Sequence, residues 1–119
     1  MSKILGIDPG LRVTGYGVIH QDKQKFTYES SGTIKTTKQD LDLAARIKII
    51  VTGIDEVIEK FSPNIVAIEK VFVNTNPQST LLLGQARGAA IAAIVSKEIN
   101  IYEYTALQIK KSVVGNGHA

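Results

Sequence analysis

The hydrophobic period of this chain changes near residue 40, and that change restricts the folds open to it. The first 36 residues contain three β-rich segments separated by short turns, at residues 3–8, 13–20 and 25–36. Between residues 40 and 61, apolar residues recur mostly every three or four positions, as on one face of an amphipathic helix. Short turns favour antiparallel pairing of the first three segments, whereas a helical crossover returns the chain to a parallel strand. The pattern predicts an α/β protein with a mixed sheet.

The second half of the chain continues with alternating strands and helices. Residues 65–69 (IVAIE) are apolar on both faces, which predicts an interior strand parallel to the first. A second helix is expected over residues 77–97, a fifth strand over 100–104, and a third helix over 106–113. A length of 119 residues is typical of one domain, so we expect a single domain over residues 1–119.

The expected second helix contains the run LLLGQARGAAIAAIV, which is apolar or small on nearly every side. Such a helix requires burial all round. Two interpretations remain open from the residues: the helix packs against a second copy of the chain, or it is a central core helix of a monomer.

Charge and composition restrict the function only weakly. The net charge of +3 favours polyanionic partners but does not by itself indicate nucleic-acid binding. There is no cysteine, and therefore neither a disulfide framework nor a thiolate metal site. We expect no membrane partner and a cytoplasmic location, because no apolar run is long enough to span a bilayer and the N-terminus lacks a signal-peptide core.

Two carboxylates fall at the ends of the first and fourth expected strands. Asp8 precedes the turn residues Pro9 and Gly10, and Glu69 ends the IVAIE segment. If these strands are parallel neighbours, the two carboxylates lie close together, and such a pair favours a hard divalent cation such as Mg²⁺ or Mn²⁺. The alternative is that Asp8 is a turn residue and Glu69 is simply solvated.

Three long motifs occur in register along the chain: ILGIDPGLRVTGYGVI, AIEKVFVNTNPQSTLLLGQARGAAI and YEYTALQIKKSVVGNG. In order and spacing they resemble the bacterial RuvC crossover-junction endodeoxyribonucleases. The resemblance implies a ribonuclease H-like fold with a five-stranded mixed sheet flanked by helices, and a homodimer. It also implies Mg²⁺-dependent, paired symmetrical cutting of four-way (Holliday) DNA junctions in recombination and repair, with Mn²⁺ as a possible substitute. RuvA and RuvB, the branch-migration proteins, are the partners that it implies.

The resemblance also assigns roles to individual residues. Asp8 and Glu69 match the first two catalytic, metal-binding carboxylates. Phe72 matches an aromatic residue that stacks on a base at the junction, although it could instead be a core side chain beneath its loop. Lys110 matches a basic residue implicated in DNA contact and catalysis.

Basic residues near these motifs are candidates for contacts with DNA phosphates. They are Arg12, Lys70, Arg87, Lys110 and Lys111. The last two, on a short helix, could equally form a solvated face.

Members of the family continue beyond the GNG motif into a helix that supplies two more acidic residues. The resemblance therefore implies that a C-terminal part is missing from the sequence given, and we expect this chain to bind one metal weakly and to cut DNA slowly or not at all. Three other functions remain open: a junction-binding dimer without catalysis, an ATP-binding domain of the actin and sugar-kinase type, and a resolvase of the YqgF type.

Overall fold

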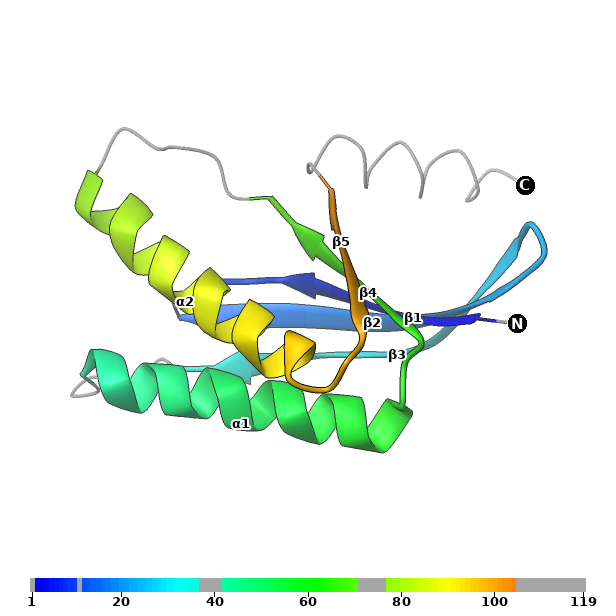
Figure 1. The fold of residues 1–119 in the computed structure, drawn as a ribbon, viewed down its shortest axis with the longest axis horizontal. Helices are drawn as coiled ribbons and strands as arrows, with labels where there is room; N and C mark the ends of the chain where they lie inside the picture. The colour runs from blue at the N-terminus through cyan, green and yellow to red at the C-terminus, as the bar shows by residue number, and fades with distance from the viewer. Residues whose placement is uncertain (1, 11, 37–41, 71–76, 105–119) are drawn as a thin grey trace.

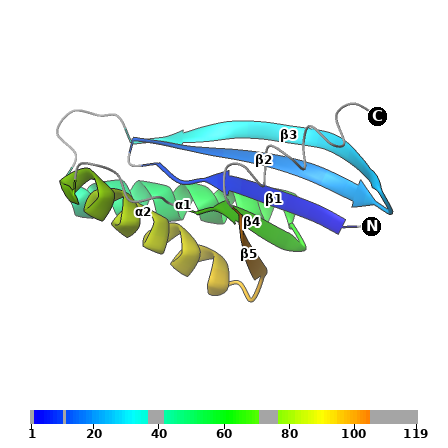
Figure 2. The ribbon, with the colours of Figure 1, turned by 90° about the horizontal axis from the view of Figure 1, so that it is seen from above.

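A five-stranded mixed sheet with helices packed on one face forms the architecture of this chain (Figures 1 and 2). The computed structural model describes residues 2–10, 12–36, 42–70 and 77–104, with the backbone alone for residues 77–80. Along the chain the elements are β1 (Ser2–Asp8), β2 (Val13–Asp22), β3 (Lys25–Lys35), α1 (Leu43–Phe61), β4 (Ile65–Glu69), α2 (Pro77–Val95) and β5 (Asn100–Tyr104).

The sheet has the strand order β3-β2-β1-β4-β5. β1, β2 and β3 pair antiparallel, whereas β4 is parallel to both β1 and β5. The predicted mixed sheet and the parallel, interior position of β4 are therefore confirmed. The third predicted helix, at residues 106–113, lies outside the described residues.

Side-chain alternation along the strands gives the sheet one face that is covered by the helices and one face that is open. Leu5 and Ile7 of β1 pair with Val66 and Ile68 of β4, and all four side chains are buried against the helices. Because successive side chains of a strand point to opposite faces, the residues that alternate with them point to the other face of the sheet. Burial of these apolar residues stabilises the fold by about 1.5–3 kcal/mol for each fully buried large side chain.

Helix α1 begins and ends where its sequence provides caps. The side chain of Asp42 accepts a hydrogen bond from the backbone N–H of Ala45, so the helix begins at Leu43, three residues later than the expected residue 40. Ser62 adopts a left-handed conformation (φ 48°) and ends the helix before Pro63. Asn64 then exchanges hydrogen bonds with the backbone of Lys3, 2.8 Å in each direction, which fixes β4 beside β1.

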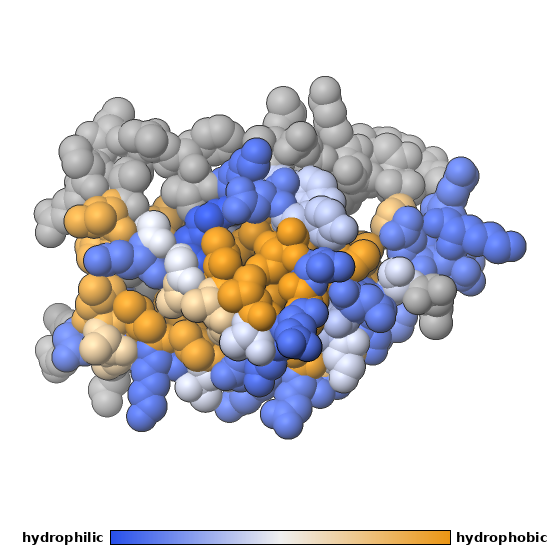
Figure 3. Space-filling model, viewed as in Figure 1, coloured by the Kyte–Doolittle hydropathy of each residue, from blue (hydrophilic) through white to orange (hydrophobic). Residues whose placement is uncertain are grey.

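Helix α2 is buried on one side only among the described residues, so the expectation of burial all round is wrong, and the choice between a second copy and a monomer core stays a prediction. Ala86, Ala90 and Ile94 face the core. On the opposite side Leu81 and Val95 are 64% and 54% exposed. The small residues Gly84, Gly88 and Ala92 are exposed beside them. Figure 3 shows apolar surface gathered over this helix. In the part of the chain that the structure describes, neither helix combines the length and apolar character needed to cross a membrane.

A β-bulge interrupts β3 next to its Ser-Ser-Gly run. Tyr28 and Ser30 pair with adjacent residues of β2, so Glu29 is the extra residue of the bulge. Its carboxylate contacts His20 and lies 3.4 Å from the Lys3 ammonium. The hydrogen bond with His20, and to a smaller extent Lys3, holds the pKa of Glu29 below its usual value.

Candidate active site

The parallel pairing of β1 with β4 brings two carboxylates together from opposite halves of the chain. The register between these strands runs from Ile4 with Ile65 to Ile7 with Ile68, so Asp8 and Glu69 follow the last paired residues. Their neighbours Ile7 and Ile68 are buried in the core, and alternation therefore directs both carboxylates to the open face of the sheet. The prediction that Asp8 and Glu69 lie close together is confirmed.

The turn after β1 is held by local hydrogen bonds. The hydroxyl of Thr14, which is buried, lies 3.3 Å from the carbonyl oxygen of Gly10 and 3.4 Å from its N–H. A Cβ atom at Gly10 would lie 2.1 Å from the carbonyl oxygen of Val13, so the turn requires glycine for this close approach. This tight turn fixes the chain immediately after Asp8.

The electrostatics of the pair favour a cation. Asp8 is exposed, whereas Glu69 is partly buried. Burial, and then the hydrogen bond and the negative charge of Asp8, raise the pKa of Glu69 above its usual value. The smaller part of this shift arises because two neighbouring carboxylates disfavour a second negative charge, and a divalent cation between them would remove that part of the penalty.

The donors at this end of the sheet fit a hard cation such as Mg²⁺ or Mn²⁺, which prefers carboxylate oxygens. Asp8 and Glu69 supply such oxygens at adjacent strand ends. Among the residues that the structure describes, no cluster of three or more His, Cys, Asp or Glu side chains is placed to hold a metal ion. Among the described residues, Asp8 and Glu69 are therefore a pair of carboxylates without a third such side chain grouped beside them.

The candidate basic residues differ in their surroundings. Arg12 and Lys70 are exposed near the ends of the strands that carry the carboxylates. Arg87, from α2, instead forms a 3.0 Å ion pair with Glu103 of β5, and its Nε donates to the backbone carbonyl of Glu69. Phe72, Lys110 and Lys111 lie outside the described residues.

The contact of Arg87 with Glu103 was not predicted from the sequence. The feature that could have indicated this contact is the parallel pairing of β4 with β5. This pairing places Glu103 beside the buried Ile68 and therefore on the helix face of the sheet. The Glu103 side chain is 47% exposed, so it lies at the rim of the helix face, within reach of a cationic side chain from the covering helix. α2 is the helix that provides one.

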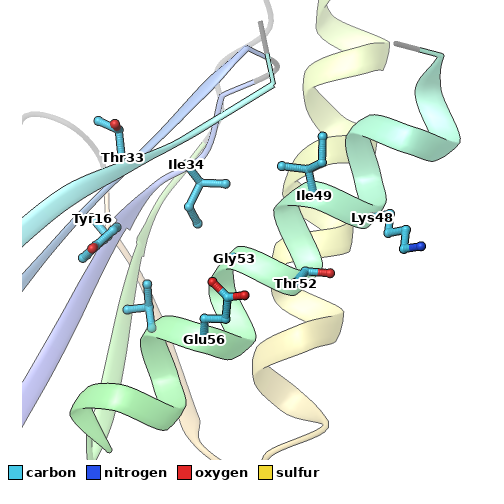
Figure 4. Close-up of a pocket in the computed structure, with 9 residues that line it drawn as sticks. Tyr16, Thr33, Ile34, Lys48, Ile49, Thr52, Gly53 and Glu56 are labelled. Carbon is cyan, nitrogen blue, oxygen red and sulfur yellow. The ribbon is translucent and has the colours of Figure 1, made fainter. Parts of the chain in front are cut away.

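A separate hollow of about 510 Å³ lies between α1 and strands β2 and β3 (Figure 4). Tyr16 and Ile34 face it from the sheet, and Gly53 allows α1 to approach Ile34 closely. None of the predicted site residues lines this hollow.

Comparison with known proteins assigns the chain to a family. The family model described as "Crossover junction endodeoxyribonuclease RuvC" matches residues 4–119. Proteins of that name from Methylobacillus flagellatus and Janthinobacterium sp. are 61% and 62% identical over 98% of this chain, which spans 67% and 64% of their lengths. The T. thermophilus RuvC solved in complex with a Holliday junction substrate is 26% identical, with a TM-score of 0.82 over 93% of this chain and 69% of that one.

These similarities agree with the geometry of the carboxylates and the sheet. The expected ribonuclease H-like fold is confirmed, and the alternative of an ATP-binding domain of the actin and sugar-kinase type is not favoured. The chain belongs to the RuvC family of crossover junction endodeoxyribonucleases.

Proposed function

We propose that this chain carries the catalytic core of a metal-dependent endonuclease that resolves four-way DNA junctions by paired symmetrical cuts, in recombination and repair. The observation that carries the proposal is that Asp8 and Glu69 lie side by side on the open face of the sheet, one residue beyond the last β1–β4 pair. The names of its relatives, and the junction in the complex of the T. thermophilus protein, support the choice of substrate.

In this proposal Asp8 and Glu69 hold Mg²⁺, for which Mn²⁺ can substitute. A bound divalent cation supplies Lewis-acid activation of water and stabilisation of the leaving oxygen in phosphodiester hydrolysis. The pKa of Glu69 is raised, so this carboxyl holds its proton more tightly in the metal-free chain, and a bound cation would favour the ionised form. Asp8, which is exposed, provides the oxygens nearest to solvent.

Contacts with DNA come from residues around this pair. Exposed Arg12 and Lys70 bind phosphates. Lys110 and Lys111 add to this basic surface, and Phe72 stacks on an unpaired base at the junction, a contact of about 1–3 kcal/mol. The partners in the cell are RuvA and RuvB, and the enzyme acts in the cytoplasm.

A homodimer completes the proposal, because symmetrical cutting of two strands requires two sites. Its interface is the exposed face of α2, where Gly84, Gly88 and Ala92 permit close approach and Leu81 and Val95 supply apolar area. Val95→Glu is expected to convert the dimer to a monomer in sedimentation analysis. Thr52→Glu, an equal change on the exposed side of α1, is the control and leaves the dimer intact.

The test of function uses a labelled four-way junction and a matched linear duplex, each with Mg²⁺ and with EDTA. We expect selective binding of the junction, with slow metal-dependent nicks that Asp8→Asn abolishes. Asp22→Asn, an equal loss of charge at the exposed end of β2, is the control and is expected to leave junction binding and nicking unchanged. Junction binding without nicks in Mg²⁺ would identify the chain as a non-catalytic junction binder. Equal binding of junction and duplex would refute the proposal.

A further inference from the structure

The side chain of Arg87 reaches from α2 to the ends of two strands. Its Nε donates to the backbone carbonyl oxygen of Glu69, at 3.4 Å, and its Nη2 lies 3.0 Å from a carboxylate oxygen of Glu103. The side chain is 18% exposed, which is low for an arginine on the surface of a small domain. One guanidinium therefore joins α2, β4 and β5 at the end of the sheet that carries the carboxylate pair.

Arg87 approaches the sheet from the face opposite the carboxylates. Glu103 is paired in register with buried Ile68, so its side chain lies on the helix face. Glu69 follows Ile68, and its side chain points to the other face. Arg87 therefore contacts the main chain of Glu69 from the helix face of the sheet, and it acts on the Glu69 carboxylate only through the backbone.

The end of β4 is paired on its β5 side, where Glu69 pairs with Tyr104, but not on its β1 side. Its described pairing with β1 ends at Ile7 with Ile68, one residue before Glu69. Toward β5, the N–H of Lys70 donates to the carbonyl oxygen of Tyr104 at 2.7 Å. A hollow of about 330 Å³ borders Arg87, and Gly84 opens it on the helix side. The guanidinium therefore borders open space on one side, and its two polar contacts hold it toward the ends of β4 and β5.

We propose that Arg87 is a positioning residue for the carboxylate pair, with Glu103 orienting its guanidinium. The metal-binding part of this inference rests on the proposed function. A planar guanidinium can donate to a carbonyl and a carboxylate at once, which the single ammonium of lysine does in a less defined geometry. Groups that orient metal ligands in this indirect way typically contribute 10- to 100-fold to metal affinity.

The test measures Mn²⁺ binding by the broadening of amide resonances near Asp8, together with the thermal midpoint. Arg87→Gln is expected to weaken Mn²⁺ binding about tenfold. Lys97→Gln is the matched control. It removes the same charge from an ion pair with Asp55, just after the C-terminal end of α2, and is expected to leave Mn²⁺ binding unchanged. A merely structural role would lower the thermal midpoint and leave the Mn²⁺ affinity at the wild-type value.

Two further variants separate the contacts of Arg87. Glu103→Gln retains the bond to the carbonyl of Glu69 and is expected to weaken Mn²⁺ binding less than Arg87→Gln. The double variant is expected to match Arg87→Gln alone, because the two residues act as one unit. Arg87→Lys is expected to restore only part of the affinity. Full restoration by lysine would show that charge alone is needed and would overturn the positioning role.

Hydrogen exchange of the Lys70 amide provides a readout that needs no metal. If Arg87 holds the end of β4, Arg87→Gln accelerates exchange of this amide by about tenfold, while the amide of Val66 keeps its protection. Unchanged exchange at Lys70 would overturn the inference whatever the metal data show. Absence of Asp8-dependent Mn²⁺ binding in the unsubstituted chain would instead refute the proposed function, with the exchange data still deciding the role of Arg87.

Discussion

Neutralising one member of the carboxylate pair is expected to stabilise the metal-free chain. Asp8→Asn keeps the size of the side chain and removes one of two negative charges at adjacent strand ends. The folded state then no longer holds Glu69 next to a like charge, which is one cause of its raised pKa. The same substitution removes a proposed metal ligand, so stability and function change in opposite directions.

The spacing of the strands gives the size of the effect. Neighbouring strands lie about 4.8 Å apart. Two unit charges at that distance repel by about 0.9 kcal/mol in water and about 3.5 kcal/mol at an effective dielectric constant of 20. Asp8 is exposed, so the lower value applies. A gain of about 1 kcal/mol raises the midpoint of thermal unfolding by about 4 °C in a domain of this size.

The pH dependence has a definite sign. Because the pKa of Glu69 is raised in the folded state, folding favours its protonated form. The contribution of Glu69 to the stability of the metal-free chain is therefore fully present below the ordinary value of 4.5 and is lost as the pH rises from there through the raised pKa. Asp8→Asn is expected to reduce this fall. Glu69→Gln is expected to remove this fall in stability completely, because the titrating carboxyl, whose pKa is raised mainly by burial, is then absent.

Thermal unfolding in EDTA, followed by circular dichroism between pH 4 and pH 8, measures both effects. Asp22→Asn, which removes one negative charge at the exposed end of β2, is the control. In Mg²⁺ the order should reverse, since a ligand that binds only the folded state raises the midpoint of the unsubstituted chain and not that of Asp8→Asn. A metal-free Asp8→Asn chain that unfolds at the same or a lower temperature, with an unchanged pH slope, would refute the reasoning.

Three further substitutions test the scaffold. Asp42→Ala removes the N-cap of α1 and is expected to cost about 1 kcal/mol in urea denaturation, whereas Asp42→Ser should retain most of the cap. Glu29→Gln is expected to remove the loss of stability that accompanies acidification through the lowered pKa of Glu29; an unchanged acid limb would contradict this. Gly10→Ala is expected to destabilise by about 1–3 kcal/mol and to weaken Mn²⁺ binding, because its Cβ meets backbone that cannot move aside. A wild-type midpoint would show that the turn relaxes.

The fold and the carboxylate pair could be predicted because local patterns determine them. The period change gave the order of elements, and the terminal position of Asp8 and Glu69 in apolar segments gave their place on the sheet. The helix boundary was missed by three residues because Asp42, rather than an earlier acid, provides the cap. The roles of Phe72 and Lys110 remain predictions, since both lie outside the described residues.

The features that sequence reasoning missed depend on contacts between distant elements. Burial of α2 was overestimated because hydropathy does not reveal how many neighbours surround a helix, and the sheet and α1 cover one side of it. The pairing of Arg87 with Glu103 requires the lateral position of α2 over β5, which no local pattern specifies. Arg87 was therefore grouped with the phosphate-binding candidates on its charge alone.

The carboxylate pair joins residues that are 61 positions apart, across a parallel strand pairing that needs α1 as its crossover. Contacts of such long sequence separation form late and slowly during folding, because loop closure must precede them. The three antiparallel strands β1, β2 and β3 alone provide no carboxylate opposite Asp8, because its partner in β2 is Gly15 and Gly15 pairs with Thr33 of β3. Any intermediate without the β1–β4 pairing is thus unable to bind metal through both groups, and the appearance of metal affinity during refolding would time the docking of β4.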